Sequence, residues 1–214
     1  MQLTDKEKSW KSAIFFVVWK KRSNFATDMT IEFNEVVLRG EEYTLSLLAR
    51  EGCLTCITGG SAVRRTRCLL ALMGFEAPTT GYVSVDGEPL TGGCIAHLRR
   101  NIAFVPASLE TVGEIVTYEP PTVNDMLSLR SNSRLKVSAA ALRQETERTG
   151  AAGQKGELLA AAVLRRKPVL VVDSPSVSSA GYLQRLAKQE GMTVIAATGD
   201  AEVLGCADSI VELE

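Results

Sequence analysis

The sequence predicts an α/β fold, built on a mostly parallel sheet flanked by helices. Three observations support this prediction: strand-length apolar runs alternate with helical segments, a buried strand passes through a small-residue turn into a helix after Gly59, and another buried strand ends in an acid at Asp173. Strands that alternate with helices form parallel sheets with helices on both faces. The 214 residues, 45% of them hydrophobic, suffice for a complete core.

The first half of the domain contains most of the predicted strands. Ile31, Phe33 and Val36 alternate in the first strand, a turn at Asp86 and Gly87 joins two others, and Gly74 ends the helix after the turn. The predicted strands cover 30–38, 42–49, 54–58, 81–90 (strand, turn, strand) and 102–106, and the predicted helices cover 66–73 and 95–101. The two strands at 81–90 and the hairpin at 30–49 are expected to form an antiparallel β subdomain.

The second half is mainly helical between 120 and 166. Thr122 is a plausible N-cap for a helix that follows the pair of prolines at 120–121. The predicted helices cover 123–129, 137–148, 155–166 and 181–190, and the predicted strands cover 169–173, 193–197 and 209–213. We assign residues 120–154 to a shortened helical subdomain within a domain that covers 29–214.

Composition excludes several classes of site. A formal net charge of −1 argues against a nucleic-acid binder that relies on a basic field. The odd number of cysteines, five, and their mostly apolar surroundings indicate reduced thiols in a cytosolic protein. The C-x-x-C pair Cys53 and Cys56 is more often core than a redox or zinc site, and His97, the only histidine, is expected on a helix surface.

Residues 1–28 differ from the remainder of the chain because lysines flank the apolar run at 13–19. This run is too short to cross a bilayer, which takes about 20 apolar residues, and no small-residue cleavage site follows it. The extension is expected either to contact a membrane surface or a partner, or to pack on the main domain as an extra element. A third interpretation is a later addition to a domain that begins at Met29.

The segment 57–70 has the pattern of an altered phosphate-binding loop. In the intact pattern, G-x-x-x-x-G-K-[ST], backbone N–H groups at a helix N-terminus hold phosphates, the lysine reaches the β and γ phosphates and the hydroxyl holds Mg²⁺. Gly59 and Thr66 match the first glycine and the hydroxyl, but Arg64 replaces the second glycine and Arg65 the lysine. We expect Arg64 to place a large cation in the cradle and Arg65 to keep the charge without the geometry of lysine. Taken alone, an ordinary strand, turn and helix would explain this segment better.

The following segments resemble, in matching order, the motifs of ABC transporter ATP-binding subunits. Residues 98–106 resemble the approach to the Q-loop, 122–127 the T-V-x-E-N-[LV] segment, 171–175 the Walker B end and 193–200 the segment T-V-I-x-x-T-H-D. Where the signature L-S-G-G-Q belongs, the chain has Gly150 followed by Ala151, Ala152, Gly153 and Gln154. The resemblance implies a P-loop NTPase fold of ABC type, dimerisation with a homologous ATPase or with itself, and a membrane permease as partner.

At most positions where the family pattern has a catalytic or nucleotide-binding residue, this chain has a residue of different chemistry. The resemblance places Ser174 at the water-activating glutamate, Gly199 at the switch histidine and Ala107 at the Q-loop glutamine. No aromatic stands near residues 39–40 to stack on adenine, and Thr66 and Asp173 remain as vestigial Mg²⁺ ligands. The resemblance implies nucleotide contacts from the following residues: Gly59, Gly60, Ser61, Ala62, Val63, Arg64, Arg65, Thr66 and Arg67.

We therefore expect a catalytically impaired ABC-type subunit, a pseudo-ATPase. It would serve as a structural or regulatory partner of an active ABC ATPase, a permease or both, located in the cytoplasm at the membrane periphery. ATP and Mg²⁺ would bind weakly or not at all, nucleic acid is no partner, and the transported substrate is unreadable. Two alternatives stay open: a working transport ATPase with arginine in place of the Walker A lysine, and a relic without present function.

Overall fold

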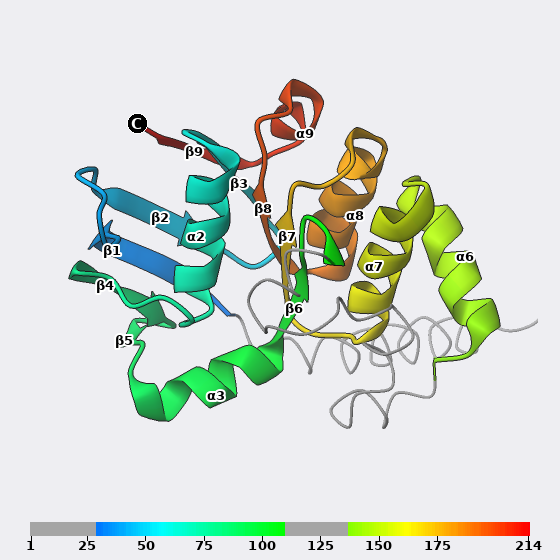
Figure 1. Ribbon diagram of the computed structural model, residues 1–214. Helices are drawn as coiled ribbons and strands as arrows, with labels where there is room; N and C mark the ends of the chain where they lie inside the picture. The colour runs from blue at the N-terminus through cyan, green and yellow to red at the C-terminus, as the bar shows by residue number, and fades with distance from the viewer. Residues whose placement is uncertain (1–28, 110–136) are drawn as a thin grey trace, which may run out of the picture.

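The computed structural model describes residues 29–109 and 137–214, which contain one parallel and one antiparallel sheet (Figure 1). Three sequence predictions therefore lie outside the described residues: the extension at 1–28, the helix at 123–129 and the motif at 122–127. The predicted helical subdomain at 120–154 is described only from Val137 onward. The division into an extension and a domain stays a prediction.

Five strands form the parallel sheet in the order β6-β7-β8-β3-β9. Every neighbouring pair runs parallel, so the carboxyl ends of all five strands lie along one edge. Their bounds are β6 (Ile102–Val105), β7 (Val169–Asp173), β8 (Thr193–Ala197), β3 (Leu54–Gly59) and β9 (Ser209–Leu213). The predicted strands in these segments are confirmed, because apolar runs of this length suit strands that are covered on both faces.

The antiparallel sheet has the order β2-β1-β4-β5 and confirms the predicted β subdomain. Phe33 on β1 pairs with Leu47 of β2 on one side and Val83 of β4 on the other, and all three side chains are buried. The strands are β1 (Ile31–Val37), β2 (Leu45–Ala49), β4 (Thr80–Val85) and β5 (Glu88–Pro89). Alternation in the sequence predicted this sheet because only one face of each strand enters the core.

The helices differ from the predictions mainly at their N-termini. Their bounds are α2 (Ala62–Leu72), α3 (Gly92–Asn101), α6 (Ala139–Thr149), α7 (Gly153–Leu164), α8 (Ala180–Glu190) and α9 (Ala201–Gly205). The predicted starts at 66 and 95 were too late for α2 and α3. The sequence analysis did not predict α9, a helix of five residues that Asp200 caps by accepting hydrogen bonds from Glu202 N and Val203 N.

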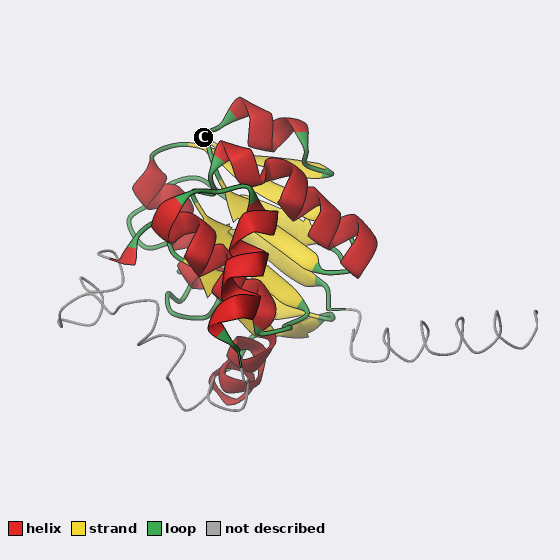
Figure 2. Cartoon of the chain, turned by 90° about the vertical axis from the view of Figure 1, so that its right-hand side faces the viewer, coloured by secondary structure: helices red, strands yellow, loops and turns green. Residues whose placement is uncertain are grey.

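The parallel sheet separates two apolar cores. Alternate residues of β7 face opposite sides: Val169 and Val171 pack with α2 and the antiparallel sheet, whereas Leu170 and Val172 pack with α7 and α8. Figure 2 shows helices lying across the strands of this sheet. The expectation of helices on both faces is thus right for one face and incomplete for the other, where the antiparallel sheet shares the cover with α2.

The cysteines and the histidine lie in ordinary surroundings. All five cysteines are free thiols; Cys56 and Cys68 are buried in the two cores, and burial raises the pKa of Cys56 to about 12. His97 is exposed on α3, as predicted. Within the described residues, no group of three or more His, Cys, Asp or Glu side chains is arranged to hold a metal ion.

Candidate functional site

The candidate site lies at the carboxyl edge of the parallel sheet. Gly59 ends β3, Asp173 ends β7, and Gly199 follows β8, which lies between those two strands. Helix α2 starts at the same edge, directly after the turn that leaves β3. Open α/β sheets bind ligands at this edge because the connecting loops and the helix N-termini gather there.

The turn after β3 is shorter than an intact phosphate cradle. Ser61 caps α2: its Oγ accepts a hydrogen bond from Arg64 N (3.2 Å) and its carbonyl oxygen accepts one from Arg65 N (3.1 Å). The helix consequently begins at Ala62 rather than near Thr66. Two backbone N–H groups that would face a phosphate in the expected loop are thus satisfied by Ser61.

Thr66 and Asp173 lie in contact, as the resemblance implied. Thr66 Oγ1 donates to Asp173 Oδ2 (2.7 Å), and Ser174 Oγ donates to Asp173 Oδ1 (3.3 Å). Burial raises the pKa of Asp173 above its usual range, although these hydrogen bonds and the positive charges of Arg65 and Lys155 oppose the shift. A hydroxyl next to a carboxylate supplies two oxygen ligands of the kind that Mg²⁺ prefers.

Asp173 is expected to lower the stability of the fold at neutral pH. A buried acid with a raised pKa stabilises the folded state below its unfolded pKa of about 3.9, and this contribution is lost as the pH rises through the folded pKa. Asp173→Asn should therefore be more stable than the wild type at pH 7, with a difference that shrinks toward pH 4. Urea denaturation across this pH range measures the difference. The exposed Glu157 provides the control Glu157→Gln, and a less stable Asp173→Asn at pH 7 would contradict the prediction.

Arg65 turns back onto the loop instead of reaching outward. Its Nη1 donates to the carbonyl oxygens of Gly59 (2.9 Å) and Gly60 (3.1 Å). The guanidinium lies beside Gly199, and the buried Nε has no hydrogen-bond partner in the structure. The cation that stands at the Walker A lysine position thus donates hydrogen bonds to the protein's own backbone.

Arg64 does not enter the cradle, so that expectation was wrong. Its Nε and Nη2 donate to Glu41 Oε2 (2.8 and 2.5 Å), Nη1 donates to Glu214 O (2.8 Å), and the guanidinium stacks over the ring of Tyr43. The hydrogen bonds from Arg64 lower the pKa of Glu41, which also accepts from Arg67. Glu41 therefore holds Arg64 and Arg67 on the side of the antiparallel sheet.

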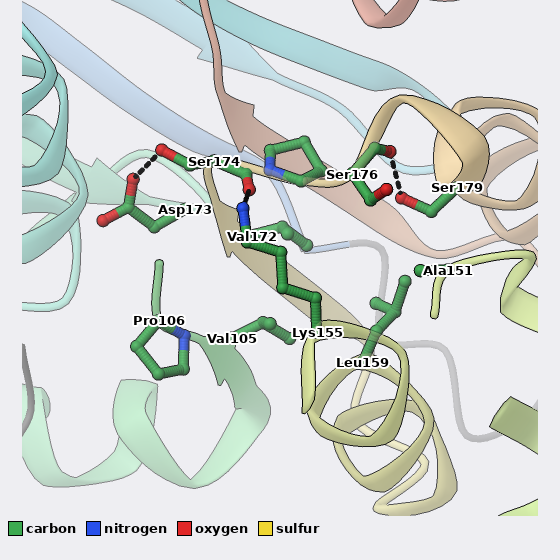
Figure 3. Close-up of a pocket in the computed structure, with 11 residues that line it drawn as sticks. Val105, Pro106, Ala151, Lys155, Leu159, Val172, Asp173, Ser174, Ser176 and Ser179 are labelled. Atoms are coloured by element: carbon green, nitrogen blue, oxygen red, sulfur yellow. Dashed lines mark hydrogen bonds between the residues drawn. The ribbon is translucent and has the colours of Figure 1, made fainter. Parts of the chain in front are cut away.

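A small pocket lies beside Asp173 (Figure 3). The pocket has space for about one water molecule. Lys155 on α7 reaches across it, and its Nζ donates to the carbonyl oxygen of Ser174 (3.0 Å). The lining residues are Val105, Pro106, Ala151, Lys155, Leu159, Val172, Asp173, Ser174, Pro175, Ser176 and Ser179.

None of the three positions that the resemblance assigns to catalysis carries an acidic or basic side chain. Ser174 adopts a left-handed backbone conformation (φ 51°), and its hydroxyl donates to Asp173. Gly199 presents no side chain, and the half-buried methyl group of Ala107 follows Pro106 after β6. Among the described residues that line the pocket, Asp173 is the only acid. A serine hydroxyl does not act as a general base near neutral pH.

The residues at the signature position form the end of the turn before α7 and the first two residues of that helix. Ala151 is buried and lines the pocket, while Ala152, Gly153 and Gln154 are exposed at the helix N-terminus. Three of these four residues thus lie at the surface of the described structure. Ala62 and Val63 are likewise exposed, on the first turn of α2.

The sequence analysis missed two residues that shape the site. Lys155 directly follows Gln154, so its place in the sequence was a usable signal. Glu41 gave no signal, because it lies 23 residues before Arg64 in the turn between β1 and β2 and meets it only in the folded chain.

No helix within residues 29–109 and 137–214 is long and apolar enough to cross a membrane.

The chain is similar to known transport proteins. Residues 43–177 match the model of the ABC transporter family. The cobalamin import ATP-binding protein of Halobacterium salinarum is 30% identical over 175 residues, which cover 72% of this chain and 44% of that protein. The thiamine import ATP-binding protein of Rhizobium meliloti is 25% identical over 178 residues, 75% of each chain. The chain spans 21% of the phosphonates import ATP-binding protein of Thiobacillus denitrificans, with 37% identity over 54 residues.

Solved structures share the fold. CbiO1 of Clostridium perfringens, part of an ABC transporter complex, superposes with a TM-score of 0.64 at 16% identity, over 87% of this chain and 85% of that one. A bacterial ABC transporter cassette solved as a dimer gives a TM-score of 0.59 at 22% identity, over 86% and 94% of the two chains.

Proposed function

Because this chain belongs to the ABC transporter family of ATP-binding P-loop proteins, we propose that it is a pseudo-ATPase that works as a structural or regulatory subunit. Its partner would be an active ABC ATPase, a membrane permease or both. It would act at the cytoplasmic face of the membrane, as a peripheral subunit. ATP and Mg²⁺ would bind weakly or not at all.

The main support for the proposal is that Ser174 occupies the position of the water-activating glutamate. Hydrolysis requires a base that activates the attacking water, and this position offers a hydroxyl that donates to Asp173. Losing one positioned catalytic group typically costs about 10²–10³ in rate, and Gly199 and Ala107 add further losses. Such losses do not simply multiply, but we expect turnover at least about 10³-fold below that of an active cassette.

The arrangement around Arg65 supports weak nucleotide binding. Phosphate binding at a P-loop depends on free N–H groups and an outward cation, whereas here Ser61 satisfies two N–H groups and Arg65 bonds to the loop carbonyls. The oxygen ligands of Thr66 and Asp173 fit Mg²⁺, but the loop does not fit the phosphates that would complete its coordination. We therefore assign no catalytic step to bound nucleotide.

A partner role has support from the surface of the signature-like turn. Ala152, Gly153 and Gln154 are exposed at the N-terminus of α7, and relatives of this chain are named as import ATP-binding proteins. One solved cassette with this fold is a dimer. We propose that this turn faces a homologous subunit, either a second copy or a different ATPase.

The alternative is a working transport ATPase with an atypical Walker A segment. The contact between Thr66 and Asp173 favours it, because this pair is the one expected to hold Mg²⁺ in an active site. It leaves the chemistry at Ser174, Gly199 and Ala107 unexplained.

Calorimetry with Mg-ATP and a phosphate-release assay separate the two functions. We expect a dissociation constant weaker than about 100 µM, corresponding to less than about 5.5 kcal/mol of binding free energy, and no measurable hydrolysis. Thr66→Ala is the matched control, since it removes the remaining hydroxyl ligand and should leave weak, Mg²⁺-independent binding unchanged. Low-micromolar binding that requires Mg²⁺ and is lost in Thr66→Ala would favour the working ATPase.

A further inference from the structure

The guanidinium of Arg65 occupies the junction of two loops. It donates hydrogen bonds to the carbonyl oxygens of Gly59, the last residue of β3, and of Gly60, and it lies against Gly199 in the loop that follows β8. These strands are neighbours in the sheet, with Cys56 paired to Ala196 and Ile57 to Ala197. One side chain therefore connects the two loops at the point where the resemblance implies the terminal phosphate of a nucleotide.

Gly199 provides the space for this side chain. A Cβ atom at position 199 would lie 3.7 Å from Nη2, 3.9 Å from Cζ and 3.9 Å from Nη1 of Arg65. Because three guanidinium atoms are almost equally distant, the flat face of the group is turned toward Gly199. A methyl group would fit in ordinary contact, but a ring carried beyond Cβ would compete with the guanidinium for the same space.

The backbone gives no other reason for glycine at this position. The φ of Gly199 is not positive, so other residues can adopt the same backbone conformation. Thr198 and Asp200, on either side, hold the turn: Thr198 N donates to Ile57 O (2.9 Å) and Asp200 N to Thr198 Oγ1 (3.0 Å). The proximity of Arg65 is the feature of position 199 that a larger side chain would disturb.

We propose that Arg65 and Gly199 form a matched pair that closes the phosphate loop without nucleotide. The guanidinium takes the place of a bound phosphate as the link between the β3 and β8 loops, so the loop is held in one conformation by the chain itself. The two departures from the family pattern then depend on each other. This inference rests on the proposed loss of nucleotide binding and specifies its structural basis.

Electrostatics fit this arrangement. The positive charge of Arg65 acts on buried Asp173, whose carboxylate would otherwise have only hydroxyl partners and Lys155 nearby. Two backbone carbonyls satisfy Nη1, while Nε stays buried without a partner. An incoming phosphate would have to displace both bonds to the loop before Nη1 could donate to it.

A double-mutant cycle without nucleotide tests the pairing. Gly199→His should shift the unfolding equilibrium toward the unfolded state by about tenfold in the wild type, and by less than about threefold in an Arg65→Ala background. Gly199→Ala is the matched control and should change the equilibrium by less than about threefold in both backgrounds. Equal shifts for Gly199→His in the two backgrounds would overturn the proposal.

The cycle stays informative if Gly199→His alone does not fold. Recovery of a cooperative unfolding transition in Arg65→Ala/Gly199→His would support the pairing, and failure of both proteins to fold would overturn it. Amide hydrogen exchange gives a second readout: Arg65→Ala should speed exchange at Gly60 and Ser61 by about tenfold, and unchanged rates would count against the closure. Tight Mg-ATP binding by the wild type would overturn the proposed function while leaving the measured coupling intact, so the two failures are distinguishable.

Discussion

Replacing Gly59 with alanine is expected to lower the free energy of unfolding by about 2–4 kcal/mol. Gly59 has a φ of 73°, and a Cβ atom there would lie 2.3 Å from the carbonyl oxygen of Leu213 on β9. Gly59 pairs with Leu213 in the sheet, so the clash falls on backbone that cannot move without breaking the ladder. Thermal or urea unfolding measures the loss.

Gly87 supplies the control for Gly59. It has a similar φ of 80°, but a Cβ atom there would meet nothing within 4 Å, so Gly87→Ala isolates the cost of the left-handed backbone. That cost is about 1–2 kcal/mol. If the two variants lost the same stability, contact with β9 would not be the reason for glycine at position 59. The larger loss in Gly59→Ala would show that this glycine is required by the sheet, independently of any bound phosphate.

Replacing Gly156 with alanine is expected to destabilise the protein by about 2–4 kcal/mol, although alanine normally favours a helix. Gly156 lies within α7, and a Cβ atom there would be 2.1 Å from the carbonyl oxygen of Ala151 and 3.3 Å from Thr146 Cγ2. The variant must therefore displace the turn at the signature position. Loss of stability by urea denaturation is the measurement.

The same substitution at Gly181, on another helix, is expected to change stability in the opposite direction. It is exposed on α8, and a Cβ atom there would meet nothing within 4 Å, so Gly181→Ala should stabilise by up to about 1 kcal/mol. Opposite signs for the two substitutions would establish that the turn at Ala151 packs directly on α7. A stabilising Gly156→Ala would mean that this turn moves freely.

Both substitutions affect segments that the family resemblance connects with nucleotide. Gly59 belongs to the expected phosphate cradle and Ala151 to the signature-like turn, yet the contacts that constrain them are made to β9 and α7. The fold therefore has its own reasons to keep these residues, independent of any nucleotide chemistry. Fold and catalytic chemistry are separable in this way because different atoms determine them.

The sequence by itself determined most helices and strands of the fold and which residues meet in the candidate site. Alternating apolar residues predicted β1 and β2, and continuous apolar runs predicted β3, β7 and β8, because burial on one face or two leaves a different pattern along a strand. The order of motifs placed Thr66 and Asp173 in one site, where their side chains are 2.7 Å apart. These features depend on local periodicity and on motif spacing, both of which can be read along the chain.

Only the tertiary structure decided how the arginines of the loop are used. Arg64 was expected in the cradle but is held by Glu41 and by Glu214, which lie 23 and 150 residues away in the chain. Arg65 turns inward because two loop carbonyls accept its hydrogen bonds and Gly199 leaves room for its guanidinium. The direction of a long charged side chain depends on partners that folding brings near, and spacing along the sequence does not encode them.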